Sequence, residues 1–331
     1  MHKNTTRPAP GRLSLWLFTA VFLAALPLAA HAQDAGGAPA PPLTTCNPRE
    51  NRADFDGDCK TDISTFNRST GYWTSVDSST NSYVSFQFGQ SGDIAAPGDY
   101  NGDGKTDRAV FRPGTGYWYI ETDITTSTFD SVAFGQSGDI PVARDYDGDN
   151  KADVAVFRPS NGYWYILKSS TNTTSSVQWG QTGDRVVPGD YDGDGKTDVA
   201  IFRPGTTSGV WWVLRSSNGS SYSYQWGLNS DWPVQADYDG DGKTDIAIFR
   251  PGNGEWWIVK SSDSSYYGVT WGTSGDRPVP GDYDGDGQAD VAVQLPGNGR
   301  WDILKSAGGS SSVLFVNAEF PVPGGYLTPL Y

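Results

Sequence analysis

The sequence predicts an all-β protein, a six-bladed β-propeller built from six four-stranded repeats of roughly 45 residues. The first observation is a nine-residue loop of the form DxDGDGxxD at residues 54–62, 99–107, 145–153, 190–198, 237–245 and 282–290, with starts 45, 46, 45, 47 and 45 residues apart. We number these loops 1 to 6. The second is that no segment between the loops has helical periodicity, and the third is a tryptophan at the same place in every repeat.

Each repeat contains four short runs that are typical of β-strands. In residues 153–191 these runs are VAVFRP, YWYILKS, SSVQWG and RVVPGDY, separated by Gly, Pro, Asn and Ser. Four strands of this length cannot bury both of their faces alone, so the repeats must pack against one another around an axis. We expect one propeller domain over residues 46–331.

Two aromatic sets recur in register and predict the packing between blades. The first set is Trp73, Trp118, Trp164, Trp211, Trp256 and Trp301, and the second is Phe88, Phe134, Trp179, Trp226, Trp271 and Phe315. Stacking on sugars is the functional alternative, but recurrence in every repeat favours a core role, because large rings dominate such cores. The residues on either side of each repeated tryptophan vary, so we expect some of them to face solvent or a ligand.

Arginine and aspartate form another recurring set. Its members are Arg68, Arg112, Arg158, Arg203 and Arg250, with Asp93, Asp139, Asp184, Asp231 and Asp276. We expect them to form structural ion pairs across the blade interfaces. A site for an acidic ligand is the alternative.

The six loops carry the predicted metal ligands. Each places oxygen-bearing side chains at positions 1, 3, 5 and 9 and a backbone carbonyl at position 7, and Ca²⁺ takes 6 to 8 oxygen ligands. The pattern is similar to the first half of an EF-hand loop without its glutamate at position 12. The predicted ligands are Asp54, Asp56, Asp58, Lys60 and Asp62; Asp99, Asn101, Asp103, Lys105 and Asp107; Asp145, Asp147, Asp149, Lys151 and Asp153; Asp190, Asp192, Asp194, Lys196 and Asp198; Asp237, Asp239, Asp241, Lys243 and Asp245; and Asp282, Asp284, Asp286, Gln288 and Asp290.

Three loops depart from the consensus. Loop 2 has Asn101 at position 3, which keeps an oxygen but loses a charge and predicts weaker binding. Loop 3 has Asn150 and loop 1 has Cys59 in place of the second glycine, where a left-handed backbone costs a residue with a side chain about 1–2 kcal/mol. Asparagine tolerates this conformation better than most residues.

The first 45 residues predict export. A basic stretch with Lys3, Arg7 and Arg12 precedes an apolar run from Leu13 to Ala30 and an Ala-His-Ala cleavage site, which is typical of a signal peptide over residues 1–32. An uncleaved anchor is the alternative. Residues 33–45 read as a Pro/Ala/Gly-rich tether. We expect a secreted, periplasmic or cell-surface protein with no membrane span after cleavage.

Composition narrows the chemistry of the mature chain. Both histidines lie inside the predicted signal, which excludes His-dependent triads and His-ligated metal sites. Its removal takes away three cations and no anions, so the formal charge of −14 becomes −17. A chain this acidic, with no basic patch, is not expected to bind nucleic acid.

The segment FGQSGDIAAPGDYNGDGKTD at 88–107 and its copies resemble the FG-GAP, or VCBS-type, calcium-binding propeller repeat. The resemblance covers most of the chain and implies calcium sites in hairpin loops at the rim of each blade. Integrin α chains and propeller lectins are members of that family. This chain has six loops where the family often has seven, and its blades are shorter than integrin blades, so no ligand site carries over residue by residue.

We therefore expect a non-enzymatic, monomeric binding or adhesion module for an extracellular glycan or protein. The alternatives are a purely structural calcium-stabilised envelope domain and a polysaccharide-active enzyme with a carboxylate pair. The enzyme ranks last, because glutamate is scarce outside the loops and no repeat carries an acidic pair set apart from the repeat pattern. Its best catalytic candidates are Glu255 and Asp302, in adjacent blades.

The two ends of the domain predict how the circle of blades closes. Loop 1 is preceded by the polar NPRENRAD, whereas residues 320–326, FPVPGGY, copy the strand that precedes every other loop. We expect this C-terminal strand to complete the first blade and to protect its edge.

We predict one disulfide, between Cys46 and Cys59, the only cysteines in the chain. By the loop-entropy model this short cross-link contributes about 3 kcal/mol at most, which would offset the left-handed backbone at Cys59. Peptide mapping of the secreted protein under non-reducing conditions should recover the two cysteines in one linked fragment. Two free buried thiols are the alternative, and recovery of both as free thiols would refute the disulfide.

Overall fold

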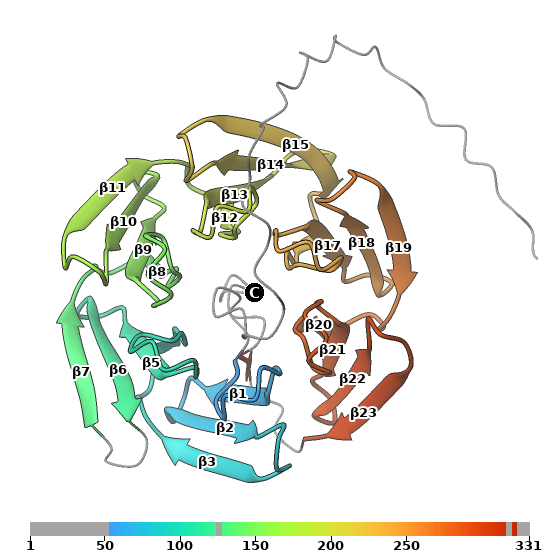
Figure 1. Ribbon diagram of the computed structural model, residues 1–331, viewed down its shortest axis with the longest axis horizontal. Coiled ribbons are helices and arrows are strands. Elements are labelled where there is room, and N and C mark those ends of the chain that lie inside the picture. The colour runs from blue at the N-terminus through green and yellow to red at the C-terminus, as the bar shows by residue number, and fades with distance from the viewer. Residues whose placement is uncertain (1–52, 124–127, 316–319, 323–331) are drawn as a thin grey trace, which may run out of the picture. The chain divides into compact units, whose positions relative to one another are not determined.

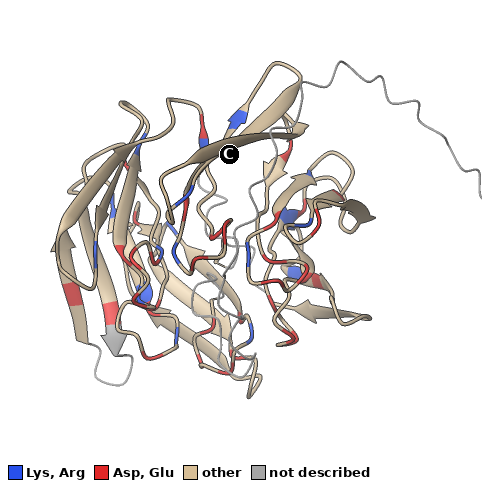
Figure 2. Cartoon of the chain, turned by 45° about the horizontal axis from the view of Figure 1, so that its top comes forward, with Lys and Arg blue, Asp and Glu red and all other residues tan. Residues whose placement is uncertain are grey.

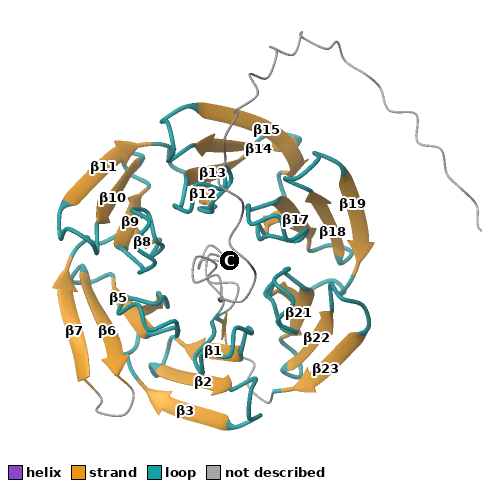
Figure 3. Ribbon diagram, viewed as in Figure 1, coloured by secondary structure: helices purple, strands orange, loops and turns teal. Residues whose placement is uncertain are grey.

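A computed structural model of the chain describes residues 53–123, 128–315 and 320–322. The predicted signal peptide, the tether and Cys46 lie outside these residues, so the Cys46–Cys59 disulfide stays a prediction. The described part contains strands, turns and loops and no helix, as Figure 3 shows. None of its segments is a helix long and apolar enough to cross a membrane.

The strands form six four-stranded antiparallel sheets arranged in a circle (Figure 1), which confirms the predicted six-bladed propeller. We number the blades 1 to 6 and give their strands from the centre outward. Blade 1 is β24 (Phe320–Pro321), β1 (Ile63–Asn67), β2 (Tyr72–Val76) and β3 (Tyr83–Gln87); blade 2 is β4 (Ile94–Ala95), β5 (Arg108–Arg112), β6 (Tyr117–Asp123) and β7 (Thr128–Ala133); blade 3 is β8 (Ile140–Pro141), β9 (Val154–Arg158), β10 (Tyr163–Leu167) and β11 (Thr174–Gln178); blade 4 is β12 (Arg185–Val186), β13 (Val199–Pro204), β14 (Ser208–Leu214) and β15 (Ser221–Leu228); blade 5 is β16 (Trp232–Pro233), β17 (Ile246–Arg250), β18 (Glu255–Val259) and β19 (Tyr266–Thr270); and blade 6 is β20 (Arg277–Pro278), β21 (Val291–Leu295), β22 (Arg300–Leu304) and β23 (Ser310–Leu314).

Burial changes from the inside of a blade to its outside. The second strand of each blade is buried at four successive residues, because both faces of the sheet pack against neighbouring blades. The outermost strands β3, β11 and β23 instead alternate between exposed and half-buried residues. The apolar runs of each repeat therefore form inner strands, and the runs in which polar and apolar residues alternate form outer strands.

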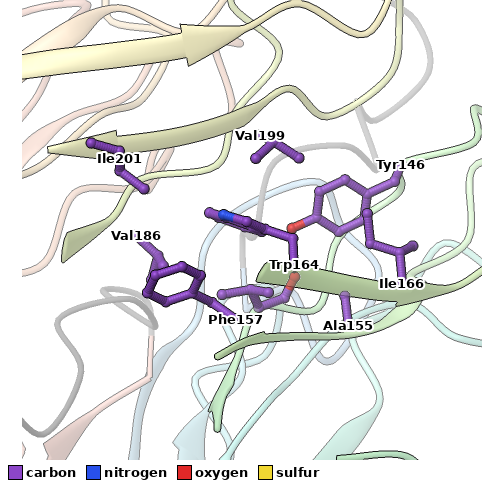
Figure 4. Packing of buried hydrophobic residues seen from close by; sticks show 9 residues of the cluster. Tyr146, Ala155, Phe157, Trp164, Ile166, Val186, Val199 and Ile201 are labelled. Atoms are coloured by element: carbon purple, nitrogen blue, oxygen red, sulfur yellow. Dashed lines mark hydrogen bonds between the residues drawn. The ribbon is translucent and has the colours of Figure 1, made fainter. Parts of the chain in front are cut away.

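The repeated tryptophans lie in the core between consecutive blades. Trp164 packs with Phe157 of its own blade and with Val199 and Ile201 of blade 4 (Figure 4). Its indole nitrogen donates a 2.7 Å hydrogen bond to the backbone oxygen of Trp179. The same bond recurs in blades 1, 2, 4 and 5, which satisfies a polar group that burial would otherwise penalise.

The second aromatic set also joins blades. The indole nitrogens of Trp179, Trp226 and Trp271 donate to backbone oxygens of the next blade, at 3.1, 3.1 and 2.9 Å. Their predicted structural role is confirmed at these three positions.

The arginine–aspartate pairs differ in place from the prediction. Arg112, Arg158, Arg203 and Arg250 form ion pairs of 2.7 to 3.1 Å with Asp93, Asp139, Asp184 and Asp231. Each aspartate directly precedes the innermost strand of a blade, and its arginine is the last or next-to-last residue of the second strand of the same blade. The pairs therefore fix the point at which the chain enters a blade rather than bridge two blades. The structural role holds, and the predicted location across the interface is wrong.

The C-terminal strand completes blade 1. β24 pairs antiparallel with β1, in the register Phe66↔Phe320 and Thr65↔Pro321. The backbone nitrogen of Val322 then donates a 2.9 Å hydrogen bond to the oxygen of Ser64. This is the pairing that the sequence copy predicts. Residues 323–326 of the copy lie outside the described part.

Replacing Val322 by alanine should destabilise the whole domain by about 2 kcal/mol, because Val322 is 2% exposed in a cluster with Phe66 and Trp73. Leu314→Ala is the matched control, since Leu314 is 67% exposed on the outer strand β23, and it should change stability by less than about 0.5 kcal/mol. Urea unfolding followed by tryptophan fluorescence measures both variants. Equal stability of the two would contradict closure by this strand.

Candidate metal centres

The six acidic loops occupy equivalent places at the inner ends of the blades. Loops 2 to 6 each connect the innermost strand of a blade to its second strand, and loop 1 leads directly into β1. In Figure 2 many of the acidic residues, drawn in red, lie on these inner loops. The resemblance implied hairpin loops at the blade rim, so the observed position, next to the innermost strands, corrects that expectation.

Backbone hydrogen bonds fold each loop around its own carboxylates. In loop 4, the Asp190 carboxylate accepts the backbone N–H groups of Gly193 and Gly195 at 2.7 and 2.8 Å. Asp194 accepts the N–H of Lys196 at 2.9 Å, and Asp198 accepts that of Tyr191 at 3.0 Å. The folded loop thus gathers its predicted ligands within one turn of chain.

The sixth position of the loop has a left-handed backbone, as the glycine pattern predicts. Gly195 has φ of 84°, Asn150 has 67° and Cys59 has 72°. Both replacements of glycine therefore adopt the conformation that glycine favours.

Serine hydroxyls support the carboxylates from the turn between the third and fourth strands. In blade 5, Ser261 donates to Asp241 at 2.8 Å and Ser262 donates to Asp239 at 2.6 Å. Equivalent hydroxyl bonds come from Ser78, Ser79, Ser169, Ser170, Ser216, Ser217 and Ser306. Sequence reasoning missed these residues, although the recurring Ser-Ser doublet after the third strand was a usable signal.

The carboxylates within a loop lie very close to one another. Groups such as Asp54, Asp56 and Asp58, or Asp237, Asp239 and Asp245, have ligand atoms within 4.8 Å of each other. Burial raises the pKa of the carboxylate at position 9 to about 7 in loops 1, 2, 4 and 5 and to about 6 in loops 3 and 6. Charge is therefore costly at these places without a cation beside it.

The donor set fits a hard divalent cation. All the gathered side-chain atoms are oxygens, which Ca²⁺ prefers. The Oδ1 atoms of Asp147 in loop 3 and Asp284 in loop 6 are buried and accept no hydrogen bond, so they have coordination capacity left over. In loop 2, the side-chain amide of Asn101 donates a 3.1 Å hydrogen bond to Oδ1 of Asp107. In the other loops the aspartate at position 9 has different hydrogen-bond partners at this oxygen.

Two further features bear on the predicted site residues. Asp77 joins Asp56 and Asp62 in a second acidic group at loop 1, where four other repeats have Lys or Arg. Asp77 was not among the residues predicted from the sequence. The side chains at position 7 cover the neighbouring loop, with Lys105 lying over Gly57 of loop 1.

The two catalytic candidates are held in ion pairs on their own blades. Glu255 pairs with Arg250 at 2.9 Å and also accepts the indole N–H of Trp257 at 3.2 Å. Asp302 pairs with Arg300 at 2.7 Å. These contacts give each carboxylate a local structural partner.

Comparison with solved structures finds similarity to proteins of low sequence identity. A streptogramin B lyase structure aligns with a TM-score of 0.51 at 10% identity, over 77% of this chain and 80% of that chain. A calcium-binding protein, regucalcin from Agrobacterium tumefaciens, aligns with a TM-score of 0.43 at 12% identity, over 66% and 73% of the two chains. An auxiliary nutrient binding protein from Bacteroides ovatus has a TM-score of 0.45 at 12% identity, over 78% and 64%. No curated protein matches the chain.

The lyase overturns one expectation from the sequence. We expected a protein that is not an enzyme, and that exclusion is wrong, because an enzyme shares the propeller fold. At 10% identity the likeness shows the fold alone, so it assigns no reaction to this chain.

The family comparison rests on the repeats themselves. The model of the FG-GAP-like repeat matches four overlapping segments, residues 99–156, 145–201, 190–248 and 237–293. Each segment contains two of the acidic loops and the strands between them. Because these segments span more than half of the sequence, the chain belongs to the family of FG-GAP-like repeat proteins.

Proposed function

We propose that this protein is an exported, monomeric calcium-binding propeller that presents a rigid surface to an extracellular glycan or protein. The observation that carries the proposal is the set of acidic loops, folded around closely spaced carboxylates at the inner ends of the blades. In each loop the side chains at positions 1, 3, 5 and 9 and the carbonyl at position 7 would hold the ion. Bound calcium would place a positive charge beside these buried carboxylates and so balance their negative charge.

A calcium role in stability follows from the position of the loops. Every loop leads directly into the second strand of a blade, so a cation there offsets repulsion at the inner ends of the blades. The ion would also fix the start of the buried second strand. We therefore assign the metal a structural role and place ligand recognition elsewhere on the propeller.

The binding surface is supported by exposed aromatic residues at the variable positions beside the repeated tryptophans. Tyr72, Tyr117 and Trp212 are 42%, 41% and 38% exposed. Tyr72 and Tyr117 begin their strands, β2 and β6, at the end of the blade opposite the loops. Exposed aromatic rings stack on sugars and act as anchors in protein interfaces. Their variation from blade to blade suits recognition better than packing.

Removal of calcium should lower the melting temperature of the native chain strongly. With a dissociation constant of about 10 μM and calcium at about 1 mM, each occupied site stabilises the folded state by about 2.7 kcal/mol. Thermal unfolding after exhaustive dialysis against EDTA, compared with 1 mM CaCl₂, measures the effect, and MgCl₂ serves as the control ion. A melting temperature that EDTA does not change would contradict a structural role for calcium.

The labelled chain should bind specific members of a glycan array in calcium, and Trp212→Ala should weaken that binding by about tenfold through loss of a stacking surface. Tyr83→Ala is the matched control, because Tyr83 is also exposed, at 63%, but lies on an outer strand. It should bind as the native chain does. If the chain binds no glycan on the array and retains no protein from the cell surface, the structural envelope alternative is favoured.

A further inference from the structure

The six loops are joined to one another by backbone hydrogen bonds. The backbone nitrogen at position 8 of each loop donates to the backbone oxygen at position 1 of the preceding loop, over 2.6 to 2.8 Å. The six bonds are Thr106 to Asp54, Ala152 to Asp99, Thr197 to Asp145, Thr244 to Asp190, Ala289 to Asp237 and Thr61 to Asp282. The last bond connects loop 1 to loop 6, so the loops form a closed circle, which we call the loop ring.

These bonds run between residues of neighbouring metal sites. The acceptor, such as Asp190, is the first predicted ligand of its own loop. The donor, Thr244, stands between the predicted carbonyl ligand Lys243 and the carboxylate ligand Asp245 of the next loop. A shift in one loop therefore moves backbone that the adjacent site uses.

Side-chain packing reinforces the same neighbour contact. The glycine at position 4 of each loop lies under the position-7 side chain of the following loop, so that a Cβ there would come within 2.8 to 3.1 Å of it. The pairs are Gly57 and Lys105, Gly102 and Lys151, Gly148 and Lys196, Gly193 and Lys243, Gly240 and Gln288, and Gly285 and Lys60. These contacts leave little room for one loop to rearrange alone.

We propose that the loop ring binds calcium as one coupled unit, in which occupation of one loop raises the affinity of its two neighbours. The inference rests on the proposed calcium role and adds coupling between its sites. A cation orders the loop that binds it, and the ordered loop then holds the donor or acceptor of its neighbour in place. The second ion therefore has less ordering to impose, which is positive cooperativity. Each loop touches only its neighbours through these bonds, so coupling falls with distance around the ring.

Calcium titration of the native chain is the first test, with a chromophoric chelator as competitor. Coupled sites give a Hill coefficient above 1, whereas independent sites of equal affinity give 1. Independent binding in this assay would overturn the coupling alone. A native chain that binds no calcium would overturn the proposed function and the coupling with it.

Two double-substitution cycles test where the coupling acts. Asp241→Asn and Asp286→Asn alter adjacent loops 5 and 6, and Asp149→Asn with Asp286→Asn alters opposite loops 3 and 6. In the adjacent cycle, the factor by which the second substitution lowers calcium affinity should differ at least about fivefold between the native background and the background that carries the first substitution. In the opposite cycle it should stay constant within about twofold. The near-ultraviolet circular dichroism of the buried tryptophans in saturating calcium checks that each variant is folded. Equal behaviour of the two cycles would contradict coupling between neighbours.

Discussion

Repulsion among the carboxylates at the inner ends of the blades is the constraint on which the rest of the structure depends. The loops bring like charges within 4.8 Å of one another, and many of these groups are shielded from water. Backbone N–H groups offset part of that cost, and so do serine hydroxyls in blades 1, 3, 4, 5 and 6. In the proposed function a cation offsets the remainder, and the backbone bonds between consecutive loops connect the six sites.

The fold could be predicted from the sequence because its information is local and repeated. The spacing of the loops gave the number of blades, and the alternation of Gly and Pro with apolar runs gave four strands in each blade. Trp164 and its equivalents were expected in the core, and all six are at most 2% exposed. The C-terminal copy of the inner strand also identified its partner, β1, because no other blade lacked that strand.

The parts that could not be predicted depend on how blades and strands approach one another in space. The bond from Thr244 to Asp190 joins residues in different repeats, and a repeat pattern does not reveal contacts between its copies. The arginine–aspartate pairs were assigned to the wrong place because the repeat pattern does not show which aspartate lies beside which arginine. Asp139 precedes the innermost strand of the blade that contains Arg158. The exclusion of enzymes failed because catalysis depends on a few placed residues and a shared fold places no restriction on them.

The completion of blade 1 by residues from the far end of the chain has a consequence for biosynthesis. A ribosome makes β1 early, but its partner β24 is made more than 250 residues later. Throughout that interval the nascent chain carries an open sheet edge that can pair with other chains. The circle can therefore close only after β24 has been made, so until then β1 must stay clear of other strands that could take the place of β24.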